Sequence, residues 1–147
     1  MQKLSETGTY TVSDRVLRAV QAEFSCGFCT DAQGAQTIGK TFRESRYLLD
    51  THTAVACTVL GAYRAETGDQ TLTVVESTAS PFKFCASVLD ALGVTEHAPG
   101  TGVLGQLTAE TGRPAPTPLA SLAGKPVRFD QVTDRGDMRA VVTEFLR

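Results

Sequence analysis

The sequence predicts an α/β segment that is rich in helix and carries one or two strands of a larger sheet. Five or six stretches have helical periodicity, whereas only residues 72–77 form a convincing strand and residues 126–132 a doubtful one. The first of these, LTVVES, shows little alternation of apolar and polar residues, as expected of a strand covered on both faces. A two-stranded ribbon is marginally stable alone. We therefore interpret residues 1–147 as a single segment whose partner strands lie elsewhere.

Two helices are predicted in the first third of the chain. Ser13 can cap the first, because its hydroxyl can accept a hydrogen bond from a free amide of the first turn. Four apolar residues then fall on one face: Val16, Leu17, Val20 and Phe24. A weaker helix covers residues 31–47. It contains Gly34 and Gly39, each of which costs up to about 1 kcal/mol relative to alanine.

A better supported helix covers residues 52–66. Asp50 can cap its start, and Gly68 can adopt the left-handed conformation that ends it. One stripe of this helix is formed by Val55, Val59 and Tyr63.

The second half of the chain begins with the strand at 72–77 and continues into a helix over residues 81–92. Ser80 is the expected cap, with proline at the first helical position. A short helix is expected at residues 104–111 and an extended piece at 126–132. The last helix carries an apolar face at helical spacing, made of Met138, Val141, Val142, Phe145 and Leu146.

Composition excludes several classes of function. The chain is 41% hydrophobic and 20% charged with a formal net charge of −2, so it offers no basic surface for nucleic acid or an anionic membrane. No apolar run approaches the roughly 20 residues of a membrane span. The start, MQKLSETGTY, lacks the apolar core of a signal peptide. We expect a cytoplasmic protein.

Cys26 and Cys29 have the spacing of redox and zinc sites. A zinc site would need two more ligands at comparable spacing, and the sequence has no second pair. A redox pair is expected to open a helix after a strand, whereas this pair follows a helix. We predict no metal site, and thiols that are either packed or incidental. A small thiol oxidoreductase is the alternative, and it would need one thiol activated as a thiolate.

The turn between residues 77 and 83 is the best candidate for a ligand site. Ser77, Thr78 and Ser80 place three hydroxyls after a predicted strand and before a helix, where ligands of α/β sheets bind. Lys83 lies in the first helical turn, a position that suits a cation only beside an anion. A simpler interpretation also fits: Ser80 caps the helix, Thr78 completes the turn and Lys83 is a solvated charge.

The chain resembles the C-terminal portion of bacterial threonine synthases over nearly its whole length. STASPFKF at 77–84 carries most of the resemblance. The other similar stretches, in order, are YTVSDRVL (10–17), DTHTAVA (50–56), AYRAETGDQT (62–71), SVLDALG (87–93), GKPVRF (124–129) and GDMRAVVTEFL (136–146).

The resemblance implies part of a fold-type II enzyme that uses pyridoxal 5′-phosphate (PLP) to convert O-phospho-L-homoserine and water into L-threonine and phosphate. The residue that matches the family's contact to the pyridine nitrogen is Thr78. A neutral hydroxyl there makes the ring a weaker electron sink than a carboxylate would. The other residues expected near the active site are Ser77, Ala79, Ser80, Lys83 and His52.

The resemblance also implies what this chain does not carry. The family's Schiff-base lysine and the glycine-rich loop for the PLP phosphate precede the matched region. The lysines present do not resemble that lysine motif; they are Lys3, Lys40, Lys83 and Lys125. We therefore expect no catalytic residue here, and an isolated chain that neither holds PLP stably nor makes threonine.

Two departures from the family pattern occur. Thr51 replaces the proline of an Asp-Pro-His-Thr motif, and Cys85 stands where small residues or proline are common. We expect His52 to be structural, satisfied by local backbone, and His97 to be exposed.

Two functions follow. The first is the C-terminal portion of a threonine synthase, which needs the N-terminal part as its partner. The second is a non-catalytic remnant or interaction module that self-associates or pairs with a partner through its exposed strand. We expect no nucleic-acid or membrane partner.

Overall fold

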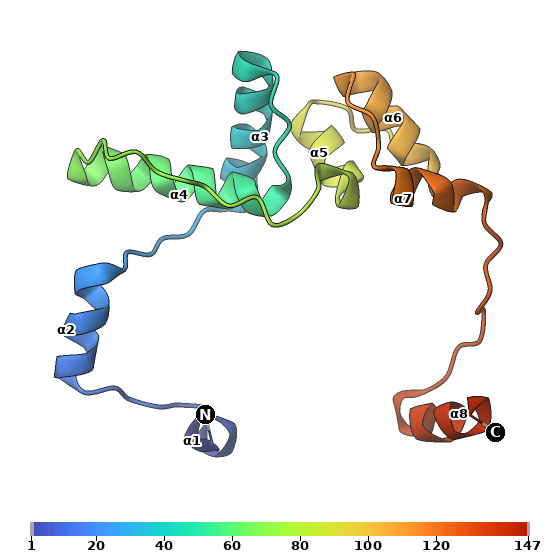
Figure 1. The fold of residues 1–147 in the computed structure, drawn as a ribbon, viewed down its shortest axis with the longest axis horizontal. Coiled ribbons are helices and arrows are strands. Elements are labelled where there is room, and N and C mark those ends of the chain that lie inside the picture. Colours follow the sequence, from blue (N-terminus) through green and yellow to red (C-terminus); the bar gives the residue numbers. More distant parts are fainter. Residues whose placement is uncertain (1, 147) are drawn as a thin grey trace.

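The computed structural model describes residues 2–146, and their regular structure is helical (Figure 1). The α-helices are α1 (Gln2–Thr7), α2 (Asp14–Glu23), α3 (Asp31–Ser45), α4 (Thr51–Thr67), α5 (Cys85–Ala91), α6 (Gly102–Thr111), α7 (Thr117–Ala120) and α8 (Met138–Phe145). Three short 3-10 helices join them: η1 (Pro81–Lys83), η2 (Ser121–Gly124) and η3 (Arg135–Asp137).

The α/β prediction is wrong for this chain. Residues 2–146 contain no strand, and both predicted strands, 72–77 and 126–132, run as irregular chain. A helix satisfies its backbone hydrogen bonds within one segment, whereas a strand needs a neighbouring strand to do so. Along the first segment, Leu72 is 94% exposed and Val74 86% exposed. Residues 72–77 therefore have a composition that suits a strand but lack the neighbouring strand with which they would form a hydrogen-bonded ladder.

The core lies among α3, α4, α5 and α6. Helix α3 packs against α4 and α5, and α5 packs against α6. The buried apolar residues of this core are Ile38, Phe42, Leu48, Leu49, Ala54, Phe82, Cys85, Val88, Leu89 and Leu107. Gly39 allows the closest approach, because a Cβ built there would lie 2.6 Å from the carbonyl oxygen of Ala91. The glycine that weakens α3 as a helix is what lets α5 pack against it.

The predicted caps of α2 and α4 are confirmed. The Ser13 side chain accepts a hydrogen bond from the amide of Val16, and Asp50 caps α4. Gly68 ends α4 with φ of 73°, in the left-handed region that glycine favours. At the start of α3, Thr30 and Gln33 form a reciprocal capping box that the sequence prediction had not singled out.

The helix predicted over 81–92 is interrupted. Ser80 caps η1 as expected, but Phe84, with φ of −130° and ψ of 38°, separates η1 from α5. The short helices α1 and α7 were not predicted. No helix within residues 2–146 combines the length and the apolar character that crossing a membrane requires.

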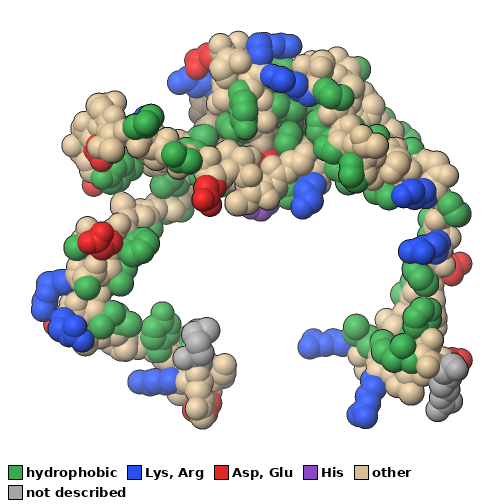
Figure 2. Space-filling view, in the orientation of Figure 1, with side chains coloured by type: hydrophobic (Ala, Val, Ile, Leu, Met, Phe, Trp, Pro, Cys, Tyr) green, Lys and Arg blue, Asp and Glu red, His purple; other side chains and the backbone are tan. Residues whose placement is uncertain are grey.

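Helices α2 and α8 stand apart from the core on extended connections at the two ends of the chain (Figure 1). Neither has a buried residue, so the predicted apolar faces exist but are uncovered. We call these the α2 face (Val16, Leu17, Val20 and Phe24) and the α8 face (Met138, Val142, Phe145 and Leu146). Figure 2 shows hydrophobic side chains along both arms.

Candidate functional site

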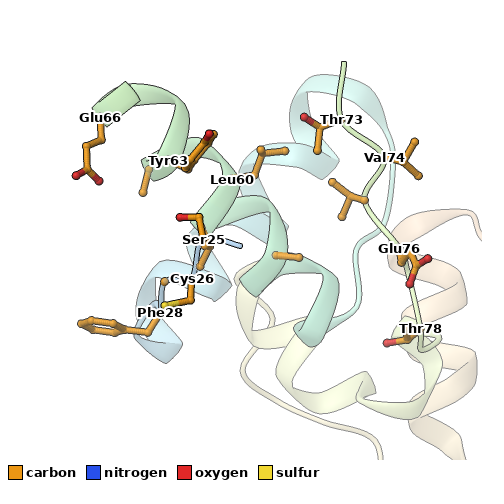
Figure 3. A pocket seen from close by; sticks show the side chains of 15 residues that line it. Ser25, Cys26, Phe28, Leu60, Tyr63, Glu66, Thr73, Val74, Glu76 and Thr78 are labelled. Atoms are coloured by element: carbon orange, nitrogen blue, oxygen red, sulfur yellow. The ribbon is translucent and has the colours of Figure 1, made fainter. Parts of the chain in front are cut away.

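An open hollow of about 640 Å³ lies along the outer face of α4. Its walls come from three segments: residues 25–28, the α4 residues from Ala56 to Glu66, and residues 73–78, which run back along the helix. Figure 3 shows Cys26 and Phe28 on one side of α4 and Thr78 on the other. The lining is mainly apolar, with Glu66 and Glu76 as its charged side chains. Thr78 is therefore one of the residues that line this hollow.

The turn that carries Thr78 is anchored on its C-terminal side by the core. The amide of Phe82 donates to the Ser80 hydroxyl over 3.3 Å, and Pro81 occupies the first position of η1. The Phe82 side chain is only 6% exposed. Ser80 and Ala79 are half-buried. These contacts fix the exit of the turn.

On its N-terminal side the turn is tied to α4 through hydroxyl groups around a buried carboxylate. We call Asp50, Thr53 and Ser77 the hydroxyl–carboxylate cluster. The Thr53 hydroxyl is hydrogen-bonded to the Asp50 carboxylate and lies 3.0 Å from the Ser77 hydroxyl. The Ser77 hydroxyl also donates to Asp50 over 3.4 Å. Asp50 is 1% exposed and Thr53 4%. The cluster links the first turn of α4 to the residue before Thr78.

Asp50 remains an anion in this buried position because donors surround it. Burial pushes its pKa upward, but hydrogen bonds from the Thr53 hydroxyl and from the amides of His52 and Thr53, with a smaller contribution from the His52 ring, together hold the pKa below its ordinary value. The amide of His52 donates to Oδ1 over 2.9 Å and that of Thr53 over 3.3 Å. The positive end of the α4 dipole acts in the same direction.

Thr78 is exposed, as is Ser77 before it, whereas Ala79 and Ser80 after it are half-buried. Ser77 and Ser80 both take part in hydrogen bonds, whereas the Thr78 hydroxyl makes none among residues 2–146. Its hydroxyl is thus available to an incoming group. Lys83 is also exposed and makes no ion pair with another described residue.

His52 lies at a different hollow from Thr78. Its ring borders a recess of about 520 Å³ with Cys29 and Phe84, and its centroid is 5.0 Å from that of Phe84. Its Nδ1 is 3.4 Å from the Asp50 carboxylate. Local contacts therefore hold this histidine, whose side chain is 64% exposed. His97 is exposed, as expected, and its Nε2 lies 3.1 Å from Asp90 and 3.2 Å from the carbonyl of Val94.

The structure separates the paired cysteines into two environments. Cys26 is exposed at the hollow beside Thr78, and Cys29 is half-buried at the recess beside His52; both are free thiols. Residues 2–146 contain no group of three or more side chains that could hold a metal ion. Burial raises the pKa of Cys57, helped by the nearby Asp50 charge, and burial also raises the pKa of Cys85.

Sequence reasoning identified Asp50 as a cap but missed the link from Asp50 through Thr53 to Ser77. The available signal was the Asp-x-x-Thr spacing, which places a hydroxyl at the third helical position beside the capping carboxylate. The partner of that hydroxyl is 24 residues further along the chain. Only the return of residues 73–78 along α4 brings the two together.

The family model described as "Threonine synthase, C-terminal" matches residues 53–143, more than half of the chain. The chain belongs to this family. A crystal structure of PLP-bound threonine synthase from Brucella melitensis is 37% identical, with a TM-score of 0.56 over 68% of this chain and 21% of that one. The similarity therefore extends to the fold, and the solved relative holds PLP.

Curated relatives carry the name threonine synthase-like 1. The human protein is 27% identical over 94 residues, which are 64% of this chain and 12% of that protein. The mouse protein is 33% identical over 82 residues, which are 55% of this chain and 10% of that protein. The chain thus spans about a tenth of the curated relatives' length and about a fifth of the solved one.

Proposed function

We propose that this chain is the C-terminal portion of a threonine synthase that converts O-phospho-L-homoserine and water into L-threonine and phosphate. In this proposal Thr78 contributes the hydrogen bond to the pyridine nitrogen of PLP. The observation that carries it is a free, exposed hydroxyl at the edge of a hollow, on a turn fixed from both sides. Membership of the threonine synthase family and the PLP-bound relative support the same assignment.

The residues present fit one part of PLP. A neutral hydroxyl can hydrogen-bond a ring nitrogen, and the apolar wall formed by Val59, Leu60 and Val75 suits a ring face. No lysine or arginine lines the described hollow, so it does not fit the PLP phosphate. When bound, PLP supplies the electron sink of the reaction. Thr78 would orient the ring and leave its nitrogen without the formal charge that a carboxylate partner would stabilise.

The remaining machinery would come from the N-terminal part of the enzyme, which we propose as the partner of this chain. The α2 and α8 faces are apolar surfaces suited to burial against it. The isolated chain is then expected to hold no PLP and to release no phosphate from phosphohomoserine. An absorption band of PLP that survives dialysis and shifts with phosphohomoserine would contradict that expectation.

The deciding experiment mixes the chain with the matching N-terminal portion and measures phosphate release from O-phosphohomoserine. We expect complementation, with Thr78→Val lowering turnover by about tenfold, the worth of one hydrogen bond of about 1.4 kcal/mol. Thr78→Ser should restore it. The matched control is Thr67→Val, which removes an exposed hydroxyl at the end of α4 that bonds the carbonyl of Tyr63 and does not line the hollow. Complementation with equal activity for Thr78→Val and Thr67→Val would remove Thr78 from the site.

The uncovered α2 and α8 faces also favour a second function, a non-catalytic interaction module. Because residues 72–77 form no strand in this chain, such a module would associate through its helices. Sedimentation of the chain with and without the N-terminal portion separates the two proposals. A stable homodimer that ignores the N-terminal portion would favour the module.

A further inference from the structure

We infer that the hydroxyl–carboxylate cluster is a positioning device for Thr78, an inference that deepens the proposed function and rests on it. Asp50, Thr53 and Ser77 would hold the backbone of residues 77–79 against the first turn of α4. The Thr78 hydroxyl is thereby kept at the edge of the hollow. Asp50 and Thr53 touch no ligand in this proposal; they act through Ser77.

The geometry shows why this link is needed. Residues 73–76 contain no regular hydrogen-bonded structure, and Val74 in that run is 86% exposed. A segment of this kind moves unless something fixes it. The first firm attachment after Thr73, whose hydroxyl bonds Arg64, is the 3.0 Å contact between the hydroxyls of Ser77 and Thr53. Thr78 follows immediately.

The cluster is rigid on the α4 side. Asp50 and Thr53 are buried, and the carboxylate is held by two amides of the first helical turn. Because a charged acceptor strengthens a hydrogen bond, the two hydroxyls around Asp50 make stronger contacts than neutral pairs would. The cluster is fixed at one end on α4, and its other end, Ser77, directly precedes Thr78. A precise ligand contact requires supporting hydrogen bonds of this kind, because they lock the contacting group.

Backbone ¹⁵N relaxation in the 147-residue chain tests the tether without any ligand. The order parameters at residues 77–79 are expected to lie near the rigid value of about 0.85 in the unaltered chain and to fall below about 0.6 in Thr53→Val. Thr53→Ser keeps the hydroxyl and should restore the rigid value. Ser77→Ala removes the other end of the contact from an exposed position, so it serves if Thr53→Val does not fold.

Thr58→Val is the matched control. Thr58 lies on the same helix, and its hydroxyl bonds the carbonyl of Ala54 and lies 2.7 Å from that of Thr37 on α3. This variant removes an equivalent hydroxyl without touching residue 77. A fall in the order parameters at 77–79 for Thr53→Val but not for Thr58→Val supports the tether. An equal fall in both, or none with Thr53→Val and Ser77→Ala, overturns it.

A double-mutant cycle in the complemented enzyme tests whether the tether acts through Thr78. If it does, Thr53→Val lowers kcat in the wild-type background and has little further effect when combined with Thr78→Val. Additive losses overturn the coupling. A Thr78→Val variant with unchanged kcat would refute the proposed ring contact instead, and the relaxation experiment would still report on the tether. The two failures are therefore distinguishable.

Discussion

Asp50 occupies an unusual position for a carboxylate. It is buried, and yet it accepts hydrogen bonds from the amides of His52 and Thr53 in the first turn of α4. As a cap its role follows from sequence: an Asp before an apolar helix is a common N-terminal signal. As the centre of a cluster with Thr53 and Ser77 it depends on a contact between residues 24 positions apart. A local pattern can show that a carboxylate is needed, but not which distant hydroxyl it will hold.

The lowered pKa of Asp50 predicts acid sensitivity. Its pKa in the folded chain is below the ordinary value of an aspartate, so ionised Asp50 contributes stability that is complete above the unfolded pKa. That contribution is lost as the pH falls through the folded pKa. We expect the urea midpoint to decrease as the pH is lowered below about 4. Asp50→Asn should be less stable at pH 6 and should show a flatter pH dependence; an unchanged slope would assign the effect to other carboxyl groups.

At the level of elements, helix α3 shows how one glycine can be unfavourable locally and required globally. Helix propensity counts Gly39 as a cost of up to about 1 kcal/mol. The contact with Ala91 of α5 explains its presence, because no side chain fits between the two backbones. Gly61 in α4 provides the contrast, since an added Cβ would meet nothing within 4 Å.

Gly39→Ala and Gly61→Ala should therefore shift stability in opposite directions. A methyl at residue 39 would lie 2.6 Å from a carbonyl oxygen, and overpacking of about 1–3 kcal/mol outweighs the gain in helix propensity. The same change at residue 61 should stabilise the chain by up to about 1 kcal/mol. Urea unfolding of the two variants measures both. Stabilisation by Gly39→Ala would show that α5 can move away at little cost.

The element that sequence reasoning misjudged is residues 72–77. Its composition suits a strand, and the sequence also indicated that partner strands lie elsewhere. Without partners the backbone of this segment has no ladder to join. Instead it returns along α4, where Arg64 donates to the carbonyl of Thr71 over 2.9 Å. Strand propensity shows only that a segment can adopt an extended conformation, whereas the presence of a neighbouring strand decides whether it forms a sheet.

At the scale of the whole molecule, the chain has a helical core and two uncovered arms. Helices α3 to α6 bury their apolar side chains against one another, whereas the side chains of the α2 and α8 faces are largely exposed. Exposed apolar surface of this kind is expected to be buried in a complex. The chain matches only about a fifth of the solved relative's length, which supports the remainder of such an enzyme as that surface's partner.

Val142→Glu tests this division between core and arm. Val142 is 57% exposed, so we expect the stability of the isolated chain to change by less than about 0.5 kcal/mol. Binding to the N-terminal portion should weaken strongly, because a charge would have to be buried. Titration calorimetry measures the affinity. Thr143→Glu, outside the α8 face, is the control and should bind normally; equal losses for both variants would argue against the α8 face as the contact.

The sequence alone determined helices α2, α3, α4, α6 and α8, the caps at Ser13, Asp50 and Ser80, and the resemblance that points to Thr78, because these depend on residues close together in the chain. Tertiary structure decided the rest. It placed Ser77 beside Thr53, put Thr78 and His52 at different hollows, and left residues 72–77 without a sheet. The physical reason is the same in each case. These outcomes depend on contacts between segments that are distant in the chain, and local sequence patterns do not specify which distant segments meet.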